Sequence, residues 1–133
     1  MRAIQQLATK AGLAAATLVA TIACAQKQSD AGFTMIRNWA QIPDGFEWGQ
    51  VISVEIDGEG NLIAFQRCGS NTCVGSSSPP LLKFGPSGEH LMSWGENMMV
   101  WPHGLYVDAD SNIWVTDGRH EGEMGEVIHK FST

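Results

Sequence analysis

The chain has 133 residues, enough for one domain, and its 44% hydrophobic and 17% charged residues are typical of a folded protein. Its formal net charge of -6 argues against nucleic acid as a partner, because phosphate binding requires a basic face. Fifteen glycines and five tryptophans beside few charges predict short strands joined by tight turns.

The first 25 residues predict a signal peptide of bacterial type. Two basic residues precede a run of apolar and small residues, 11–25, which is too short for a permanent transmembrane helix. Ala23–Ala25 fits a cleavage site, while residues 21–24 alternatively fit a lipobox in which Cys24 carries the lipid. Both alternatives predict export, either periplasmic or secreted, or as a membrane-anchored lipoprotein.

Cleavage after residue 25 would leave two cysteines, Cys68 and Cys73, and six basic residues against 14 acidic ones, a net charge of -8. In an oxidising compartment this pair favours a disulfide that closes a small loop. Two free thiols are the alternative. The spacing is only a weak indication of a metal site.

Two stretches of sequence repeat with an offset of 51 residues. Residues 54–65 and 105–116 each read as apolar alternation, a polar turn and a second apolar run, and Asp57 corresponds to Asp108 in the two turns. Four short antiparallel strands in roughly 40–50 residues are typical of a propeller blade. The sequence therefore predicts an all-β fold built of such blades.

The expected organisation is a signal peptide at 1–25, a lead-in with an outer strand at 26–50, a first blade at 51–100 and a second, truncated blade at 101–133. Because a closed propeller has about four to eight blades, this incomplete propeller of about one and three-quarter blades is expected to need further blades as partners. The expected strands are 33–39, 51–56, 61–66, 81–84, 90–94, 104–107, 112–116 and 127–131, with loops at 68–80 and 119–125. The tryptophans are expected to pack between blades: Trp39, Trp48, Trp94, Trp101 and Trp114.

Two segments resemble the NHL-repeat six-bladed propellers and, more narrowly, the peptidyl-α-hydroxyglycine α-amidating lyase group. The first contains Val-x-Ile-Asp at 54–57 and Asn-Leu-x-x-Phe-x-Arg at 61–67, and the second contains Pro-His-Gly-Leu at 102–105. The resemblance implies a zinc-dependent lyase that cleaves a peptide-like substrate, a peptidyl-α-hydroxyglycine, into an amide and glyoxylate. A non-catalytic NHL propeller that binds a protein or another ligand is the alternative.

The same resemblance implies residue roles. His103 matches the first of three histidines that hold zinc, and Arg67 matches an active-site arginine that fixes the substrate. The backbone carbonyls of Val54 and Leu105 match ligands of a structural calcium. The other two zinc histidines of the family are not in this chain. The catalytic tyrosine has no counterpart either, because Tyr106 does not match it. The fragment is therefore expected to be inactive alone.

Residue chemistry suits these roles but leaves simpler ones open. Neutral imidazole is a good zinc ligand, and a guanidinium binds a carboxylate through two hydrogen bonds. His103 could instead pack in a turn after a proline. Arg67 could be an exposed residue at a strand end, or one paired with an acid such as Glu55.

Overall fold

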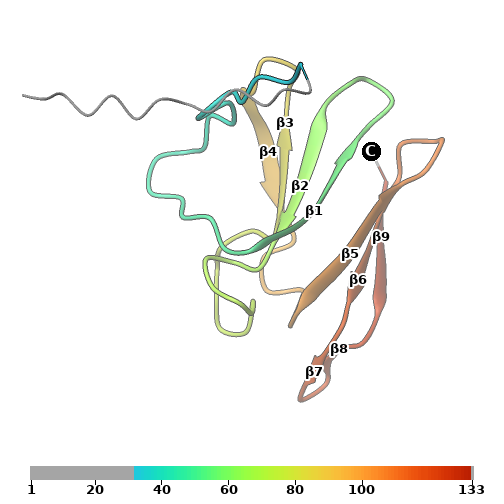
Figure 1. Cartoon of the computed structure of the whole chain (residues 1–133). Helices are drawn as coiled ribbons and strands as arrows, with labels where there is room; N and C mark the ends of the chain where they lie inside the picture. The colour runs from blue at the N-terminus through green and yellow to red at the C-terminus, as the bar shows by residue number, and fades with distance from the viewer. Residues whose placement is uncertain (1–31, 133) are drawn as a thin grey trace, which may run out of the picture. The chain divides into compact units, whose positions relative to one another are not determined.

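The computed structural model describes residues 32–132, so the predicted signal peptide and the lipidation of Cys24 lie outside the described residues. The segment from Ile36 onward forms a compact unit of β-strands, in which no helix is described (Figure 1). The strands are β1 (Val51–Ile56), β2 (Leu62–Gln66), β3 (Leu81–Phe84), β4 (His90–Trp94), β5 (Pro102–Val107), β6 (Ile113–Asp117), β7 (His120–Glu121), β8 (Met124–Gly125) and β9 (Ile128–Phe131).

These strands form antiparallel sheets that confirm the predicted fold class. Strands β1-β2-β3-β4 pair in chain order to form one four-stranded sheet, and β5-β6-β9 form a second sheet. The sequence repeat with an offset of 51 residues is also a repeat in the structure, since β2 and β6 are each the second strand of their sheet. Each strand expected between residues 51 and 131 is present, with its ends shifted by two residues at most.

The predicted outer strand at 33–39 is wrong. The described residues before β1, 32–50, contain no strand, and Gln41 forms an isolated parallel bridge to Glu89. Asn38 has a φ of 54°, which turns the chain just before it reaches this edge. Trp39 then packs on Phe84, with ring centroids 6.3 Å apart, so side-chain burial replaces strand pairing here.

The segment 119–125 was expected to be a loop, and it contains a short hairpin formed by β7 and β8. Gly122 and Gly125 adopt φ values of 61° and 93°, a conformation that glycine adopts without steric cost. The polar composition concealed this hairpin, because its strands have only two residues each.

Side chains from both sheets form the core between them. The cluster consists of Ile63, Phe65, Leu81, Met99, Ile113 and Val115, all of which are buried. On the opposite face of the first sheet, Ala64, Leu82 and Phe84 are covered by residues that include Trp39, Phe46 and Trp48. Strand β2 is therefore apolar on both faces, which explains why its sequence does not alternate between polar and apolar residues.

The polar turn of each repeat is built around an aspartate. Asp57 accepts hydrogen bonds from the backbone N–H groups of Glu59 and Asn61, both at 2.9 Å, and pairs with Lys83 at 2.7 Å. Burial alone would raise the pKa of Asp57, but the hydrogen bonds from Lys83 and Asn61 outweigh it and lower the pKa to about 2. In the second repeat, a hydrogen bond from Trp114 is the main cause that lowers the pKa of Asp108 to about 2.

These aspartates predict acid sensitivity. Because the pKa of Asp57 falls from an ordinary 3.8 to about 2 on folding, its carboxylate stabilises the fold above about pH 4, and this contribution is lost as the pH falls toward 2. We expect Asp57→Asn to lower the free energy of unfolding by about 1–2 kcal/mol near neutral pH and to reduce its fall below pH 4. Urea denaturation of both proteins at about pH 6 and about pH 3 measures this. Asp44→Asn, at an exposed position, is the control, and an unchanged pH profile in Asp57→Asn would refute the assignment.

Candidate functional site

Arg67 and His103 lie at the same end of the two sheets. Arg67 follows the last residue of β2, and His103 is the second residue of β5. The first strands of the sheets, β1 and β5, are neighbours. The Nε of Arg67 donates a hydrogen bond of 3.0 Å to the backbone carbonyl of Pro102, next to His103. The fold thus brings the two predicted site residues together.

The guanidinium of Arg67 is held from several sides. Its Nη1 donates to Gln50 at 3.1 Å and to Asn71 at 2.5 Å, and its central carbon lies 3.6 Å from the ring centroid of Trp101. Arg67 is only 9% exposed. Both simpler roles for this side chain are therefore wrong: it is neither an exposed strand end nor the ion-pair partner of Glu55.

One nitrogen of the Arg67 guanidinium, Nη2, is able to bind a further group. Within residues 32–132, Nη2 makes no hydrogen bond. Burial, and then the positive charge of Arg119, lower the pKa of Arg67 from its ordinary value. The guanidinium nevertheless stays charged near neutral pH, because the pKa of an arginine lies far above 7. The site therefore offers a fixed cation with a free N–H group.

Trp101 connects Arg67 with His103. The ring centroids of Trp101 and His103 are 5.2 Å apart, and Arg119 lies over the same indole with its guanidinium carbon 4.2 Å from the centroid. The expectation that all tryptophans pack between blades holds for Trp94, which contacts the core between the sheets. Trp101 also lies between groups of the two blades, but it packs against the guanidinium groups of Arg67 and Arg119 rather than in the apolar core.

A β-bulge presents His103. The register of β5 and β6 shifts between Pro102 and Gly104, so His103 is the extra residue, and such bulges redirect a side chain. The corresponding residue of β1, Ile52, lies at a bulge of the same kind. His103 is exposed, and within the described part of the chain its ring nitrogens make no hydrogen bond. The imidazole is thus available as a ligand.

Gly118 makes room for this arrangement. It occupies the position in the second repeat that Arg67 occupies in the first. A Cβ atom on Gly118 would lie 3.0 Å from Cε3 of Trp101 and 3.2 Å from Cβ of His103. A side chain here would therefore displace Trp101 or His103. The offset of 51 residues, applied to Arg67, would have identified this glycine in the sequence.

Two buried polar side chains fix the chain segments that enter β1 and β5. Gln66 accepts hydrogen bonds from the N–H groups of Gly49 at 2.8 Å and Gly69 at 3.2 Å. Asp117, the matching residue of the second repeat, accepts from the N–H groups of Val100 and Trp101, both at 2.6 Å. These bonds hold the backbone of Trp101, and the sequence analysis missed them.

The predicted disulfide between Cys68 and Cys73 is present, and both residues are buried. Its loop carries Asn71, which binds Arg67, and Thr72, whose hydroxyl donates to the carbonyl of Val100 at 2.9 Å. The N–H of Cys73 donates to the same carbonyl at 2.9 Å. The loop therefore joins the first sheet to the segment that leads into the second.

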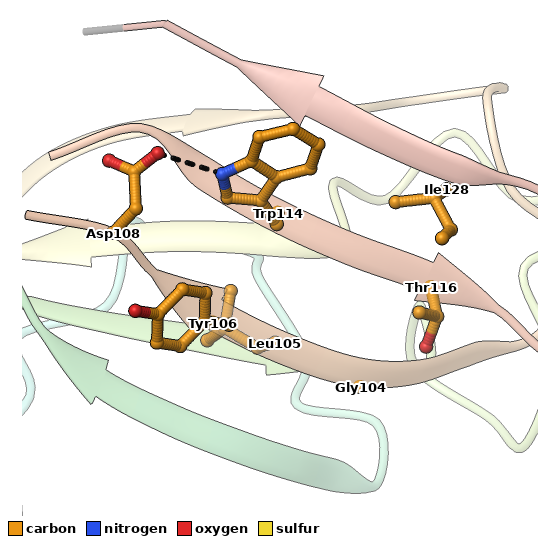
Figure 2. Close-up of a pocket in the computed structure, with 7 residues that line it drawn as sticks. All are labelled: Gly104, Leu105, Tyr106, Asp108, Trp114, Thr116 and Ile128. Atoms are coloured by element: carbon orange, nitrogen blue, oxygen red, sulfur yellow. Dashed lines mark hydrogen bonds between the residues drawn. The ribbon is translucent and has the colours of Figure 1, made fainter. Parts of the chain in front are cut away.

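A shallow pocket of roughly 590 Å³ lies on the second sheet (Figure 2). It is lined by Gly104, Leu105, Tyr106, Asp108, Trp114, Thr116 and Ile128. Its only carboxylate, Asp108, is engaged by Trp114 Nε1 at 2.9 Å and by Asn112. The pocket thus presents apolar surface and no free acid–base pair.

Among residues 32–132, no group of three His, Cys, Asp or Glu side chains is placed to hold a metal ion. His103 can supply one zinc ligand. Val54 and Leu105 occupy corresponding positions in the neighbouring strands β1 and β5. Zinc and calcium binding remain predictions. In the same described residues, no helix is long and apolar enough to cross a membrane.

Two antiparallel sheets that repeat in sequence, and whose first strands contact each other, have the arrangement of blades of a β-propeller. No protein-family model matches the chain. The chain is, however, similar to amidating enzymes. It is 31% identical over 99 residues to peptidyl-alpha-hydroxyglycine alpha-amidating lyase 2 of Drosophila melanogaster, covering 62% of this chain and 24% of that protein.

Two mammalian proteins show the same similarity. The peptidyl-glycine alpha-amidating monooxygenase of Mus musculus is 32% identical over 100 residues, which cover 57% of this chain and 10% of that protein. The Rattus norvegicus enzyme is 35% identical over 86 residues, which cover 52% and 9%. The comparisons confirm the resemblance stated from the sequence. The chain spans about a quarter of the fly relative and about a tenth of the mammalian ones.

Proposed function

We propose that this chain supplies two blades, and part of the active centre, of a lyase that cleaves peptidyl-α-hydroxyglycines into an amide and glyoxylate. The observation that carries the proposal is the junction of Arg67, Trp101 and His103 at one end of the sheets. The similarity to the amidating lyases supports the same conclusion. The disulfide is consistent with export, because such bonds persist in oxidising compartments.

In this proposal Arg67 binds the carboxylate of the substrate. Its Nη2 is left without a protein partner in the described residues, while Nε and Nη1 are fixed by Pro102, Gln50 and Asn71. A guanidinium locked in this way loses little conformational freedom when it binds a carboxylate. The substrate's reacting end is then held beside His103.

His103 would hold a zinc ion together with two ligands from outside this chain, since catalytic zinc sites use about three protein ligands and one open position. The bound metal would supply a Lewis acid at the hydroxyl of the substrate. The fit rests on an exposed imidazole whose nitrogens make no hydrogen bond within residues 32–132. Val54 and Leu105 would contribute backbone carbonyls to a calcium ion, a ligand type that suits this cation.

A second candidate function is a non-catalytic propeller that binds a ligand. The observation that favours it is the pocket on the second sheet, which presents apolar surface and whose carboxylate, Asp108, is engaged by Trp114. A whole protein in which further blades place two more histidines near His103 would exclude this candidate.

The chain alone is expected to be inactive. One histidine cannot hold catalytic zinc, so purified residues 26–133 should release no glyoxylate from a peptidyl-α-hydroxyglycine. Glyoxylate release above the uncatalysed rate would contradict this prediction.

A chimera tests the proposed function itself. Residues 36–132 replace the corresponding segment of the Drosophila melanogaster lyase, and glyoxylate release is measured. We expect measurable turnover, because the chimera would combine Arg67 and His103 with the groups that this chain lacks. A folded chimera without turnover would contradict the proposal.

A further inference from the structure

Arg119 and Arg67 share one aromatic ring without an acid to neutralise them. The side-chain ion pairs of residues 32–132 join Lys83 to Asp57 and His120 to Glu126, and neither involves an arginine. Two uncompensated guanidinium groups thus lie together in a chain whose formal net charge is -6. None of the roles assigned above uses Arg119.

The geometry keeps both cations close. Their guanidinium carbons lie 3.6 Å and 4.2 Å from the centroid of Trp101, so they cannot be further apart than the sum of these distances. Stacking on an indole stabilises each cation, but two like charges at this separation repel each other. An anion that contacts both would relieve that repulsion.

The two arginines differ in a way that indicates two separate contacts. Arg67 is buried and offers only Nη2, whereas Arg119 is exposed and makes no side-chain hydrogen bond within the described residues. Glu121 and Glu123 follow Arg119 in the β7–β8 hairpin and are exposed. Their charge disfavours a long polyanion, so a compact ligand fits better.

We propose that Arg67, Trp101 and Arg119 form a two-cation site for a short acidic peptide, with the terminal carboxylate at Arg67 and a neighbouring acidic side chain at Arg119. The first contact rests on the proposed function. The contact at Arg119 predicts the class of substrate, which is peptides with Asp or Glu before the terminal glycine unit.

The test compares two peptides of equal size, N-acetyl-Asp-Gly and N-acetyl-Asn-Gly, which differ in one charge. Their affinities for the full chain are measured by titration of tryptophan fluorescence at low salt. The aspartyl peptide should bind about fivefold more tightly, the upper range for an exposed ion pair. The preference should shrink as salt is added, because Arg119 is exposed.

Arg119→Gln should abolish the preference and leave the asparaginyl peptide unaffected. Arg67→Lys, which keeps the charge, should weaken both peptides to a similar extent. Lys130→Gln is the matched control, because Lys130 is an exposed cation that lies 4.9 Å from the ring centroid of another tryptophan, Trp114. This control should bind both peptides as the unmodified chain does.

Equal affinities for the two peptides in the unmodified chain would overturn the two-cation site, as would a preference that survives Arg119→Gln or a failure to bind either peptide. If the equal affinities both fall in Arg67→Lys, the contact at Arg119 is overturned and the carboxylate contact at Arg67 stands. Turnover of the chimera is measured separately, so failure of the lyase proposal is distinguishable from failure of this site.

Discussion

Arg67→Ala is expected to lower the free energy of unfolding by about 3 kcal/mol, which corresponds to a fall of roughly 10–20 °C in the melting temperature of a domain of this size. The substitution removes the donor to the carbonyl of Pro102 and leaves the amides of Gln50 and Asn71 without this partner. It also removes the cation stacked on Trp101. Arg67 thus connects the two sheets as well as facing the proposed substrate.

Thermal melting followed by circular dichroism measures this effect. Arg37→Ala is the control, because Arg37 is exposed and should change the melting temperature little. Arg67→Lys should fall between the two, since lysine keeps the charge but loses the planar stacking and one or more hydrogen bonds. An unchanged melting temperature in Arg67→Ala would show that the bonds around Arg67 contribute nothing to stability.

His103→Ala is expected to lower the turnover of the chimera by at least about a hundredfold. Substitutions of groups that merely orient a zinc ligand typically cost about 10–100-fold, so removal of a ligand itself should cost no less. Stability should change little, because His103 is exposed and its nitrogens make no hydrogen bond in the described residues.

Turnover, zinc content and melting temperature of the chimera are measured together. His90→Ala removes an imidazole that bonds to Ser93 in β4 and serves as the control. A His103→Ala chimera that keeps its zinc and its turnover would refute the ligand role. A large loss of stability with unchanged zinc would identify His103 as a packing residue.

The blades could be predicted because their pattern is local. Apolar runs on either side of Asp57 and Asp108 mark two strands and the turn between them, and each aspartate fixes its turn with hydrogen bonds to the following few residues. The prediction of a strand at 33–39 is wrong because such a strand does not depend on a local pattern. Its pairing depends on an edge far away in the sequence, and the turn at Asn38 and the burial of Trp39 prevent it.

In the candidate site, too, the residues in local motifs could be predicted and the contacts with distant segments could not. Short motifs pointed to Arg67 and His103, but the groups around them come from other segments. Asn71 belongs to the disulfide loop, and Arg119 lies between β6 and β7. No local pattern places these groups around Trp101. The polar character of residues 119–125 suggested a solvated loop and gave no sign that Arg119 stacks on an indole.

The central claim is that this end of the sheets forms part of a zinc lyase centre. Anomalous X-ray diffraction at the zinc edge from crystals of the chimera tests it most directly. We predict a zinc peak about 2.0–2.1 Å from a ring nitrogen of His103. A zinc ion bound elsewhere, with no peak within bonding distance of His103, would contradict it.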